Sequence, residues 1–268
     1  MLRWLDAETQ RPGAPKKDEP PLIGLSATPF RMDPDESERL AKRFDARCFP
    51  EDQKSLYQRL LTDQVLAQPN AEAIETHAGL TAEEVEALSR IPEPWDSEVL
   101  DLVKVLEKIN RRLADDAGRN EILLRQIVEA KEQHILFFAN SVQHAEEMAI
   151  RLNLHGIPAA AISGNTDQSA RRDFLARFQR GELRVLCNHS VLTTGFDAPK
   201  TDMILISRAV FSPVRYMQMV GRGLRGVKNG GTQTCRIVTV LDNLGRFKDR
   251  HPYHYCHRYF ESLKGRGS

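Results

Sequence analysis

The 268-residue sequence contains no Gly-Lys dipeptide, and it therefore lacks the Gly-x-x-x-x-Gly-Lys-Ser/Thr pattern of a phosphate-binding P-loop. Its one acidic pair near the start, Asp18-Glu19, follows Lys16-Lys17 and precedes two prolines, whereas a Mg²⁺-binding carboxylate of a nucleotide site belongs at the end of an apolar strand. This pair is interpreted as part of a solvated linker. The sequence thus excludes a self-contained P-loop nucleotide site.

Long apolar runs, paired cysteines and an excess of one charge are also missing. No stretch approaches the roughly 20 apolar residues that span a bilayer, and no signal peptide opens the chain, so we expect a cytoplasmic protein without a membrane partner. The widely spaced cysteines favour reduced thiols over a disulfide framework. A formal net charge of +1 provides no general basic field, so any nucleic-acid surface must be local.

Short apolar runs alternate with helical patterns from residue 118 onward. The runs are continuous, as expected of strands covered on both faces, and lie at 135–139, 159–162, 184–187, 203–206 and 237–241. Candidate helix caps follow the first two runs, at Asn140 or Ser141 and at Thr166. These units predict an α/β fold with an open parallel sheet and helices on both faces, with the functional motifs beyond the carboxyl ends of the strands.

The first 117 residues have a different pattern. Residues 1–33 hold a polar, proline-bearing run and one apolar strand at 22–25. Residues 34–117 are charged and helical in pattern, with an apolar stripe over 99–113 that we expect to be core. Pro92 and Pro94 break the chain before that stripe, so a helical connector or subdomain fits better than part of the sheet. The predicted divisions are 1–33, 34–117, 118–250 and 251–268.

One segment has the composition of a phosphate-binding site. Gln218-Met219-Val220-Gly221-Arg222-Gly223-Leu224-Arg225 combines an amide with two guanidiniums, which stay charged and offer planar forks of donors. Ser212-Pro213 predicts the start of a helix that leads into this octet. Residues 221–226 also spell Gly-x-Gly-x-x-Gly, but that fingerprint must follow a strand and open a helix. Here a helix precedes it and a turn follows, so we reject a dinucleotide site.

The octet and four upstream segments resemble superfamily 2 helicases, which are nucleic-acid-dependent ATPases with two RecA-like domains. The octet is similar to their sixth motif, 188–199 to the fifth, 135–140 to the fourth and 25–29 to the third, while Gln168-x-x-Arg171 matches the helix before the fifth motif. The resemblance implies a RecA-like second domain at 118–250 and a remnant of the first at 1–33. The chain would then be a C-terminal fragment of an ATP-dependent helicase, without ATPase activity of its own.

The resemblance also implies roles for single residues. Arg225 would be the finger that reaches the γ-phosphate of ATP, with Arg222 as a second phosphate contact and Gln218 orienting that group or the attacking water. Nucleotide contact and coupling between domains are implied for Gly195, Asp197, Ser26 and Thr28. Nucleic-acid phosphates would be contacted by Asn140, Ser141, Ser163, Gly164, Arg171, Thr193 and Thr194. The P-loop and the Mg²⁺ ligands would come from the missing first RecA-like domain, and no metal ligand is assigned in this chain.

Two features of the motifs bear on the nucleic acid. His189-Ser190, and the glutamine that begins the sixth motif, depart from the pattern of many RNA-remodelling members. Thr-Thr-Gly-Phe-Asp-Ala-Pro and the octet look more like RadD-like DNA-repair proteins and type III restriction subunits, so DNA is expected as partner rather than RNA. The alternative from another class is a non-catalytic RecA-like module that binds nucleic acid or a partner protein.

The tail at 251–268 combines several metal-binding residue types with aromatic side chains. His251, His254, Cys256 and His257 lack the Cys-x-x-Cys spacing and make a poor tetrahedral cage, so we do not expect zinc. The aromatic residues are expected to cover a hydrophobic edge of the sheet, and the histidines to be ordinary surface groups.

Overall fold

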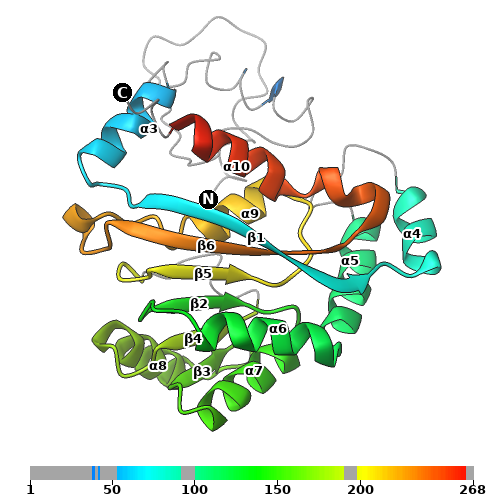
Figure 1. Cartoon of the computed structure of the whole chain (residues 1–268), viewed down its shortest axis with the longest axis horizontal. Coiled ribbons are helices and arrows are strands. Elements are labelled where there is room, and N and C mark those ends of the chain that lie inside the picture. The colour runs from blue at the N-terminus through cyan, green and yellow to red at the C-terminus, as the bar shows by residue number, and fades with distance from the viewer. Residues whose placement is uncertain (1–37, 40–41, 43–52, 92–99, 190–197, 264–268) are drawn as a thin grey trace, which may run out of the picture.

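A computed structural model describes residues 38–39, 42, 53–91, 100–189 and 198–263. Its centre is a six-stranded sheet in the order β1-β6-β5-β2-β4-β3, and all neighbouring strands run parallel (Figure 1). The strands are β1 (Gln68–Gly79), β2 (Ile135–Phe138), β3 (Ala159–Ile162), β4 (Val185–Asn188), β5 (Met203–Ile206) and β6 (Thr234–Asn243). The predicted α/β fold with a parallel sheet is confirmed.

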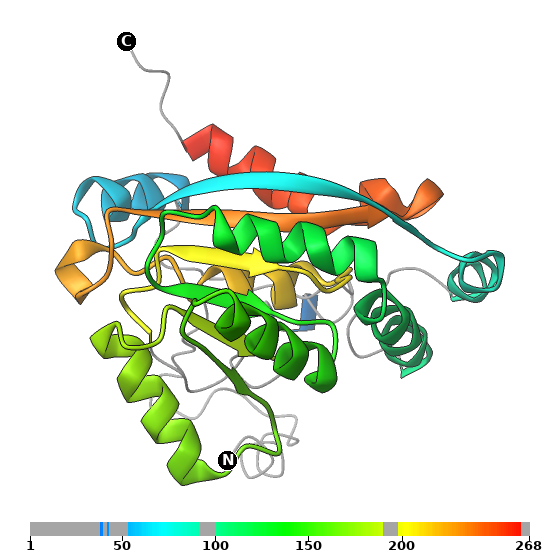
Figure 2. The same cartoon turned by 60° about the horizontal axis from the view of Figure 1, so that its bottom comes forward.

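Helices cover both faces of this sheet. They are α3 (Gln53–Thr62), α4 (Ala82–Ser89), α5 (Leu100–Ala114), α6 (Ala117–Val128), α7 (Val142–Leu154), α8 (Gln168–Arg180), α9 (Pro213–Val220) and α10 (Pro252–Leu263), with 3-10 turns η1 (Val227–Asn229) and η2 (Gly245–Arg250). Figure 2 brings α6 and α7 in front of the sheet, while α9 lies behind it. None of the helices in the described ranges has the length and apolar character needed to cross a bilayer.

Alternate residues of each strand enter two separate cores. On β2, Ile135 and Phe137 pack with α6 and α7, whereas Leu136 and Phe138 pack with the side of α8, α9 and α10. Both faces are apolar because crossover helices cover both, and this is why the strands read as continuous apolar runs. The five strand positions predicted from those runs are confirmed, although β6 extends beyond its predicted limits at both ends.

Local signals set the helix starts. Ser141 caps α7 by accepting a hydrogen bond from the backbone N–H of His144, and Ser212 caps α9 ahead of Pro213 at its first turn, as predicted. The cap expected at Thr166 is wrong. Asp167 caps α8 instead, and the Thr166 hydroxyl accepts from the backbone N–H of Ser163, closing the turn that precedes the helix.

We expected residues 34–117 to be a helical segment outside the sheet, and this expectation is wrong for residues 68–79, which form β1. This twelve-residue strand pairs in parallel with β6 along the edge of the sheet. Its alanines and glutamates have higher helix than strand propensity, but pairing with β6 and packing beneath α10 decide the outcome. Pro69 is tolerated because an edge strand leaves one row of backbone groups unpaired.

A third, smaller core lies at the carboxyl ends of the strands. Leu102, Ile109 and Leu113 of α5 are buried there against Leu88 of α4 and Phe211 of the loop after β5, so the helical stripe is core as predicted. Figure 1 shows α4 and α5 at the end of the molecule to which the arrowheads point. The predicted strand at 22–25 lies outside the described residues.

The tail forms α10, which lies across the β1 side of the sheet (Figure 1). Tyr253 and Phe260 are buried in the core beneath it, as expected, whereas Tyr255 is 57% exposed. The expectation that all the histidines are surface groups is wrong for His251, which is 2% exposed and packs edge-on against Tyr216. Burial lowers the pKa of His251 to about 3.

Candidate functional site

The arginine octet begins on α9 and ends at the edge of the sheet where the strands start. Because α9 follows β5 and runs back against the strand direction, its eight residues carry the chain about 12 Å toward the amino ends of the strands. Leu224 O then accepts a hydrogen bond from the N–H of Ala67, the residue before β1, at 3.1 Å. The expectation that all motifs lie beyond the carboxyl ends is therefore wrong for Arg222 and Arg225.

Glycines force the backbone of this segment into tight contact with its surroundings. A Cβ on Gly223 would lie 2.4 Å from the Cys235 sulfur and 2.9 Å from Cδ1 of Ile204. A Cβ on Gly226 would lie 2.1 Å from the carbonyl oxygen of Gln64. A side chain at either position would push the loop off the sheet, so these glycines fix where the arginines beside them stand.

The partner of the loop is the turn at 64–67 between α3 and β1. Leu66 and Arg225 form an antiparallel bridge, and Val65 O accepts from the N–H of Gly226 at 3.0 Å. On its other side, Arg225 O accepts from the N–H of Thr232 at 3.0 Å. Sequence reasoning missed this turn, because its contact with the octet joins residues more than a hundred positions apart.

The side chains of the octet differ in exposure. Gln218 is exposed on α9, Arg222 and Arg225 are half-buried, and Met219 and Val220 are buried in the core. Residues 218–226 include no carboxylate. Two guanidiniums and an amide are hydrogen-bond donors that suit phosphate oxygens, and the segment has no carboxylate to bind Mg²⁺.

The predicted nucleic-acid residues lie at the opposite end, after β2 and β3. Ser163 is 4% exposed, and its carbonyl oxygen accepts a hydrogen bond from the Arg171 guanidinium at 3.0 Å. Gly164 is exposed, and a Cβ added to it would meet nothing within 4 Å. Ser141 is half-buried at the start of α7. The structure therefore places Ser141, Ser163, Gly164 and Arg171 along one edge, separated from Arg222 and Arg225 by the length of α9.

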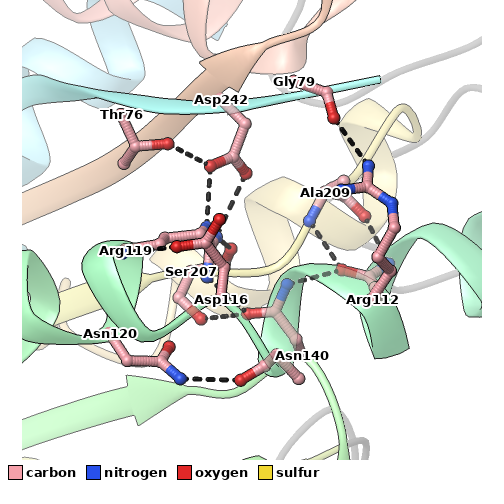
Figure 3. A network of polar contacts seen from close by, with 12 residues as sticks. Thr76, Gly79, Arg112, Asp116, Arg119, Asn120, Asn140, Ser207, Ala209 and Asp242 are labelled. Atoms are coloured by element: carbon pink, nitrogen blue, oxygen red, sulfur yellow. Dashed lines mark hydrogen bonds and ion pairs between the residues drawn. The ribbon is translucent and has the colours of Figure 1, made fainter. Parts of the chain in front are cut away.

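Asn140 differs from its neighbours because its side chain is 2% exposed and already bonded. Its amide nitrogen donates to Oδ1 of Asn110 at 3.0 Å, and its Oδ1 accepts from Arg119 at 3.3 Å and from the Ser207 hydroxyl. Figure 3 shows this side chain between α5 and the loop after β5. Asn140 thus holds the edge in shape, and a phosphate contact at this point is left to Ser141.

The buried centre of this network is an ion pair that sequence reasoning missed. Arg119 of α6 donates from Nε to Oδ1 of Asp242 at 2.7 Å, and neither side chain is more than 3% exposed (Figure 3). The Thr76 hydroxyl of β1 donates to the same oxygen at 2.6 Å, and Arg119 also donates to Ser207 O. The only signal in the sequence was Asp242 at the end of an apolar strand.

The histidine next to this network is held neutral. Burial, and then the charges of Arg119, Arg151 and His189, lower the pKa of His144 to about 3. Its neutral Nδ1 accepts a hydrogen bond from the N–H of Asn140 at 3.2 Å, which fixes the end of β2 to α7.

Six predicted residues lie outside the described part of the chain. They are Ser26, Thr28, Thr193, Thr194, Gly195 and Asp197. Their roles stay predictions.

Comparison with known proteins identifies the domain. Residues 118–227 match the family model described as helicase conserved C-terminal domain. This segment is a superfamily 2 helicase C-terminal domain. The match covers the strands from β2 to β5, α9 and the whole arginine octet.

Curated relatives agree with this assignment. The putative ATP-dependent helicase IRC3 of Saccharomyces cerevisiae is 31% identical over 126 residues, which cover 46% of this chain and 18% of that protein. The ATP-dependent rRNA helicase RRP3 of Candida albicans is 27% identical over 130 residues, covering 48% of this chain and 24% of its own. The chain thus spans less than a third of the length of either relative.

A solved structure is also similar. A DEAD box protein from the hyperthermophile Methanococcus jannaschii superposes with a TM-score of 0.43 at 24% identity. The superposition covers 53% of this chain and 37% of the DEAD box chain.

Proposed function

We propose that this chain is the second motor domain of an ATP-dependent nucleic-acid helicase or translocase. The observation that carries the proposal is the arginine loop, whose backbone is fixed by Gly223 and Gly226 on one side and by the 64–67 turn on the other. A loop held this way presents guanidiniums at a constant position, which stabilisation of a transferring phosphoryl group requires.

The division of labour follows from what the sequence contains. ATP, when bound with Mg²⁺, supplies the phosphoanhydride bond to be cleaved, and a P-loop domain other than this one would hold it. Arg225 and Arg222 would neutralise charge on the γ-phosphate, and Gln218 would orient that group or the attacking water. Residues 218–226 include no carboxylate, and we expect the P-loop domain to supply the Mg²⁺ ligands.

The edge after β2 and β3 would bind nucleic acid through phosphates. Ser141, Gly164 and Arg171 offer a hydroxyl, an open backbone and a guanidinium there, and contacts of this kind are blind to sequence. Helix α9 connects this edge to the arginine loop, so one rigid element would link the nucleic-acid contacts to the nucleotide.

DNA is the proposed partner. The support is the amino-acid sequence of the fifth and sixth motifs, which resembles that of DNA-repair proteins and restriction subunits. The relative RRP3, in contrast, is named as an rRNA helicase. Anisotropy titrations with single-stranded DNA, double-stranded DNA and single-stranded RNA of one sequence test this choice. Tightest binding to RNA would overturn the DNA assignment and leave the motor assignment intact.

The edge assignment has a matched test on α8. Arg171→Ala should weaken strand binding by about tenfold, because one charge-assisted hydrogen bond to phosphate is lost. Arg172→Ala removes the same charge from the exposed neighbour and should change the dissociation constant by less than about twofold. Equal effects of the two substitutions would show only a general charge effect, and the phosphate contact at Arg171 would be rejected. Tight, sequence-specific binding would instead favour the non-catalytic binding module.

A further inference from the structure

The segment between β5 and α9, residues 207–212, is buried although it forms no helix or strand. Ala209, Val210 and Phe211 are each no more than 5% exposed, and they lie directly before Ser212, the residue that caps α9. Buried backbone N–H and C=O groups need hydrogen-bond partners. The position at which α9 starts therefore depends on the groups that bond to this segment.

The side chain of Asn110 on α5 holds the segment. Its Oδ1 accepts a hydrogen bond from the N–H of Ala209 at 2.9 Å, and its Nδ2 donates to the carbonyl oxygen of the same residue at 3.2 Å. An opposing residue in an antiparallel sheet makes this same pair of bonds. Asn110 is 3% exposed, so both bonds are shielded from water.

Two more hydrogen bonds fix the orientation of the Asn110 amide. Its Nδ2 also donates to the carbonyl oxygen of Leu106, one turn earlier on α5, at 2.8 Å, and its Oδ1 also accepts from Nδ2 of Asn140 at 3.0 Å. Both amide hydrogens and both lone pairs of the oxygen are thus used. Figure 3 shows Asn140, Ser207 and Ala209 together, where the loops after β2 and β5 meet. One side chain therefore joins α5, the end of β2 and the segment before α9.

Helix α5 is itself anchored to the frame of the domain. Ile109 and Leu113 are buried in the small core at the carboxyl ends of the strands. Arg112 forms an ion pair with Glu84 of α4 at 2.7 Å and donates to the carbonyl oxygen of Gly79, at the end of β1. Both helices lie before the segment that matches the helicase family model. The contact with Ala209 thus reaches the family segment from a helix outside it.

The chain from Ala209 to Arg225 is held at both ends. Arg225 lies beside the 64–67 turn, whereas Gln218 lies within α9, between that turn and the contact at Ala209. We propose that Asn110 is a positioning residue for Gln218, acting through Ala209 and the start of α9. The inference rests on the proposed function, since it assumes that Gln218 orients the γ-phosphate or the attacking water. It makes turnover depend on α5.

Hydrogen exchange followed by mass spectrometry tests the contact in the chain itself. Asn110→Ala removes the acceptor of the Ala209 N–H, so exchange over residues 207–212 should become about tenfold faster or more. Exchange in β3, at the other edge of the sheet from β1, should stay the same.

Steady-state kinetics test the consequence in the ATPase that combines this chain with a P-loop domain. Asn110→Ala and Gln218→Ala should each lower kcat about tenfold, because a small displacement of a group that orients the reactants is costly in rate. The KM for ATP and the strand concentration at half-maximal rate should change by less than about twofold in Asn110→Ala. In a Gln218→Ala background, Asn110→Ala should lower kcat further by less than about twofold.

Two further variants separate this role from a loss of stability. Asn110→Ser keeps a hydroxyl that bonds to the carbonyl oxygen of Leu106 within α5 and loses the bonds to Ala209. It should lower kcat as Asn110→Ala does, and it replaces that variant if the alanine chain does not fold. Asn153→Ala is the matched control, because Asn153 of α7 makes the same pair of bonds with the N–H and C=O of Ala159, at 3.2 and 2.9 Å, at the start of β3. It should change kcat by less than about twofold.

The outcomes separate this inference from the proposed function. Unchanged exchange over 207–212, or equal losses of kcat in Asn110→Ala and Asn153→Ala, would overturn the positioning role and leave the motor assignment standing. A full further loss of kcat in the Gln218→Ala background would show that Asn110 does not act through Gln218, and would overturn it too. If the unchanged chain supports no turnover with a P-loop domain, both proposals fail.

Discussion

Gly226 is a residue at which the arginine loop leaves no room for a side chain. Its backbone φ is −80°, so the requirement for glycine comes from space and not from backbone conformation. The atom that an added Cβ would strike is the backbone oxygen of Gln64, which cannot rotate away as a side chain would. Any larger residue must therefore separate the loop from the 64–67 turn.

Gly226→Ala should lower the free energy of unfolding by about 1–3 kcal/mol or more, as overpacking does. Urea denaturation followed by circular dichroism measures the change. Gly164→Ala is the matched control, because nothing lies within 4 Å of the added methyl group. Equal stability of the two variants would mean that the loop moves freely and does not hold Arg225 in place.

His144 predicts how stability depends on pH. Its pKa is about 3 in the folded chain and about 6.5 when unfolded. Above pH 6.5 the His144 imidazole is neutral in both the folded and the unfolded chain. Between pH 6.5 and pH 3 it is protonated only in the unfolded chain. The free energy of unfolding should therefore fall by about 1.4 kcal/mol per pH unit from this residue as the pH drops below 6.5.

Urea titrations at pH 7 and pH 5 measure this contribution. His144→Asn keeps an acceptor for the Asn140 N–H, and it should reduce the stability difference between the two pH values by about 2 kcal/mol. His155→Asn, at the exposed end of the same helix, should leave the difference unchanged. An undiminished difference in His144→Asn would contradict the buried neutral imidazole.

At the scale of elements, the interior strands could be predicted from sequence and the edge strand could not. Strands such as 203–206 are short apolar runs, because burial on both faces leaves them no polar positions. β1 is exposed along one side. Its alternation of more buried and more exposed residues is interrupted at Ala73 and Ile74, which are both half-buried. A mixed pattern rich in Ala and Glu favours a helix locally, and the pairing with β6 and the packing beneath α10 override that preference.

The site could be predicted only where its chemistry is local. The octet is contiguous, and its glycines and arginines are visible in the sequence. Arg119, Asn140 and Asp242 meet only after β2, β6 and α6 have assembled, and nothing near each residue indicates its partners.

The Arg119–Asp242 pair joins α6 to β6, and we expect the stability of the fold to depend on it. Arg119→Met leaves the Asp242 carboxylate buried with the Thr76 hydroxyl as its remaining described side-chain partner, and should lower the free energy of unfolding by about 3–5 kcal/mol. Arg119→Met combined with Asp242→Asn removes the buried charge and should recover part of this loss. Urea denaturation measures each variant.

A surface ion pair provides the control for this test. Arg180→Gln breaks the exposed contact with Glu182 and should leave the unfolding midpoint unchanged. If Arg119→Met is equally harmless, the network does not hold the carboxyl edge together, and the positions of Asn140 and Ser207 need another explanation.

At the scale of the whole molecule, the two predicted activities lie at opposite ends of one helix. The all-parallel sheet gathers Ser141, Gly164 and Arg171, which we propose as nucleic-acid contacts, at its carboxyl edge. Helix α9 returns the chain to the amino edge, where Arg225 meets the turn before β1. β1 therefore contributes to both ends, since Thr76 binds the buried network and the turn before Gln68 supports the loop. An edge strand from outside the matched family segment completes the frame of the domain.

This frame makes the arginine finger testable without damage to the fold. The Arg225 backbone is held by hydrogen bonds that its side chain does not make, so Arg225→Ala should keep the fold, and a cooperative thermal unfolding transition would show this. In the ATPase that combines this chain with a P-loop domain, nucleic-acid-stimulated turnover should fall by about 10³-fold or more. Arg225→Lys should recover little, because lysine keeps the charge and loses the planar fork.

Lys228→Ala, at an exposed position three residues further on, should retain normal turnover. The chain without a P-loop domain should hydrolyse no ATP in any variant. Near-normal turnover by folded Arg225→Ala would remove Arg225 from the γ-phosphate and leave Arg222 as the finger.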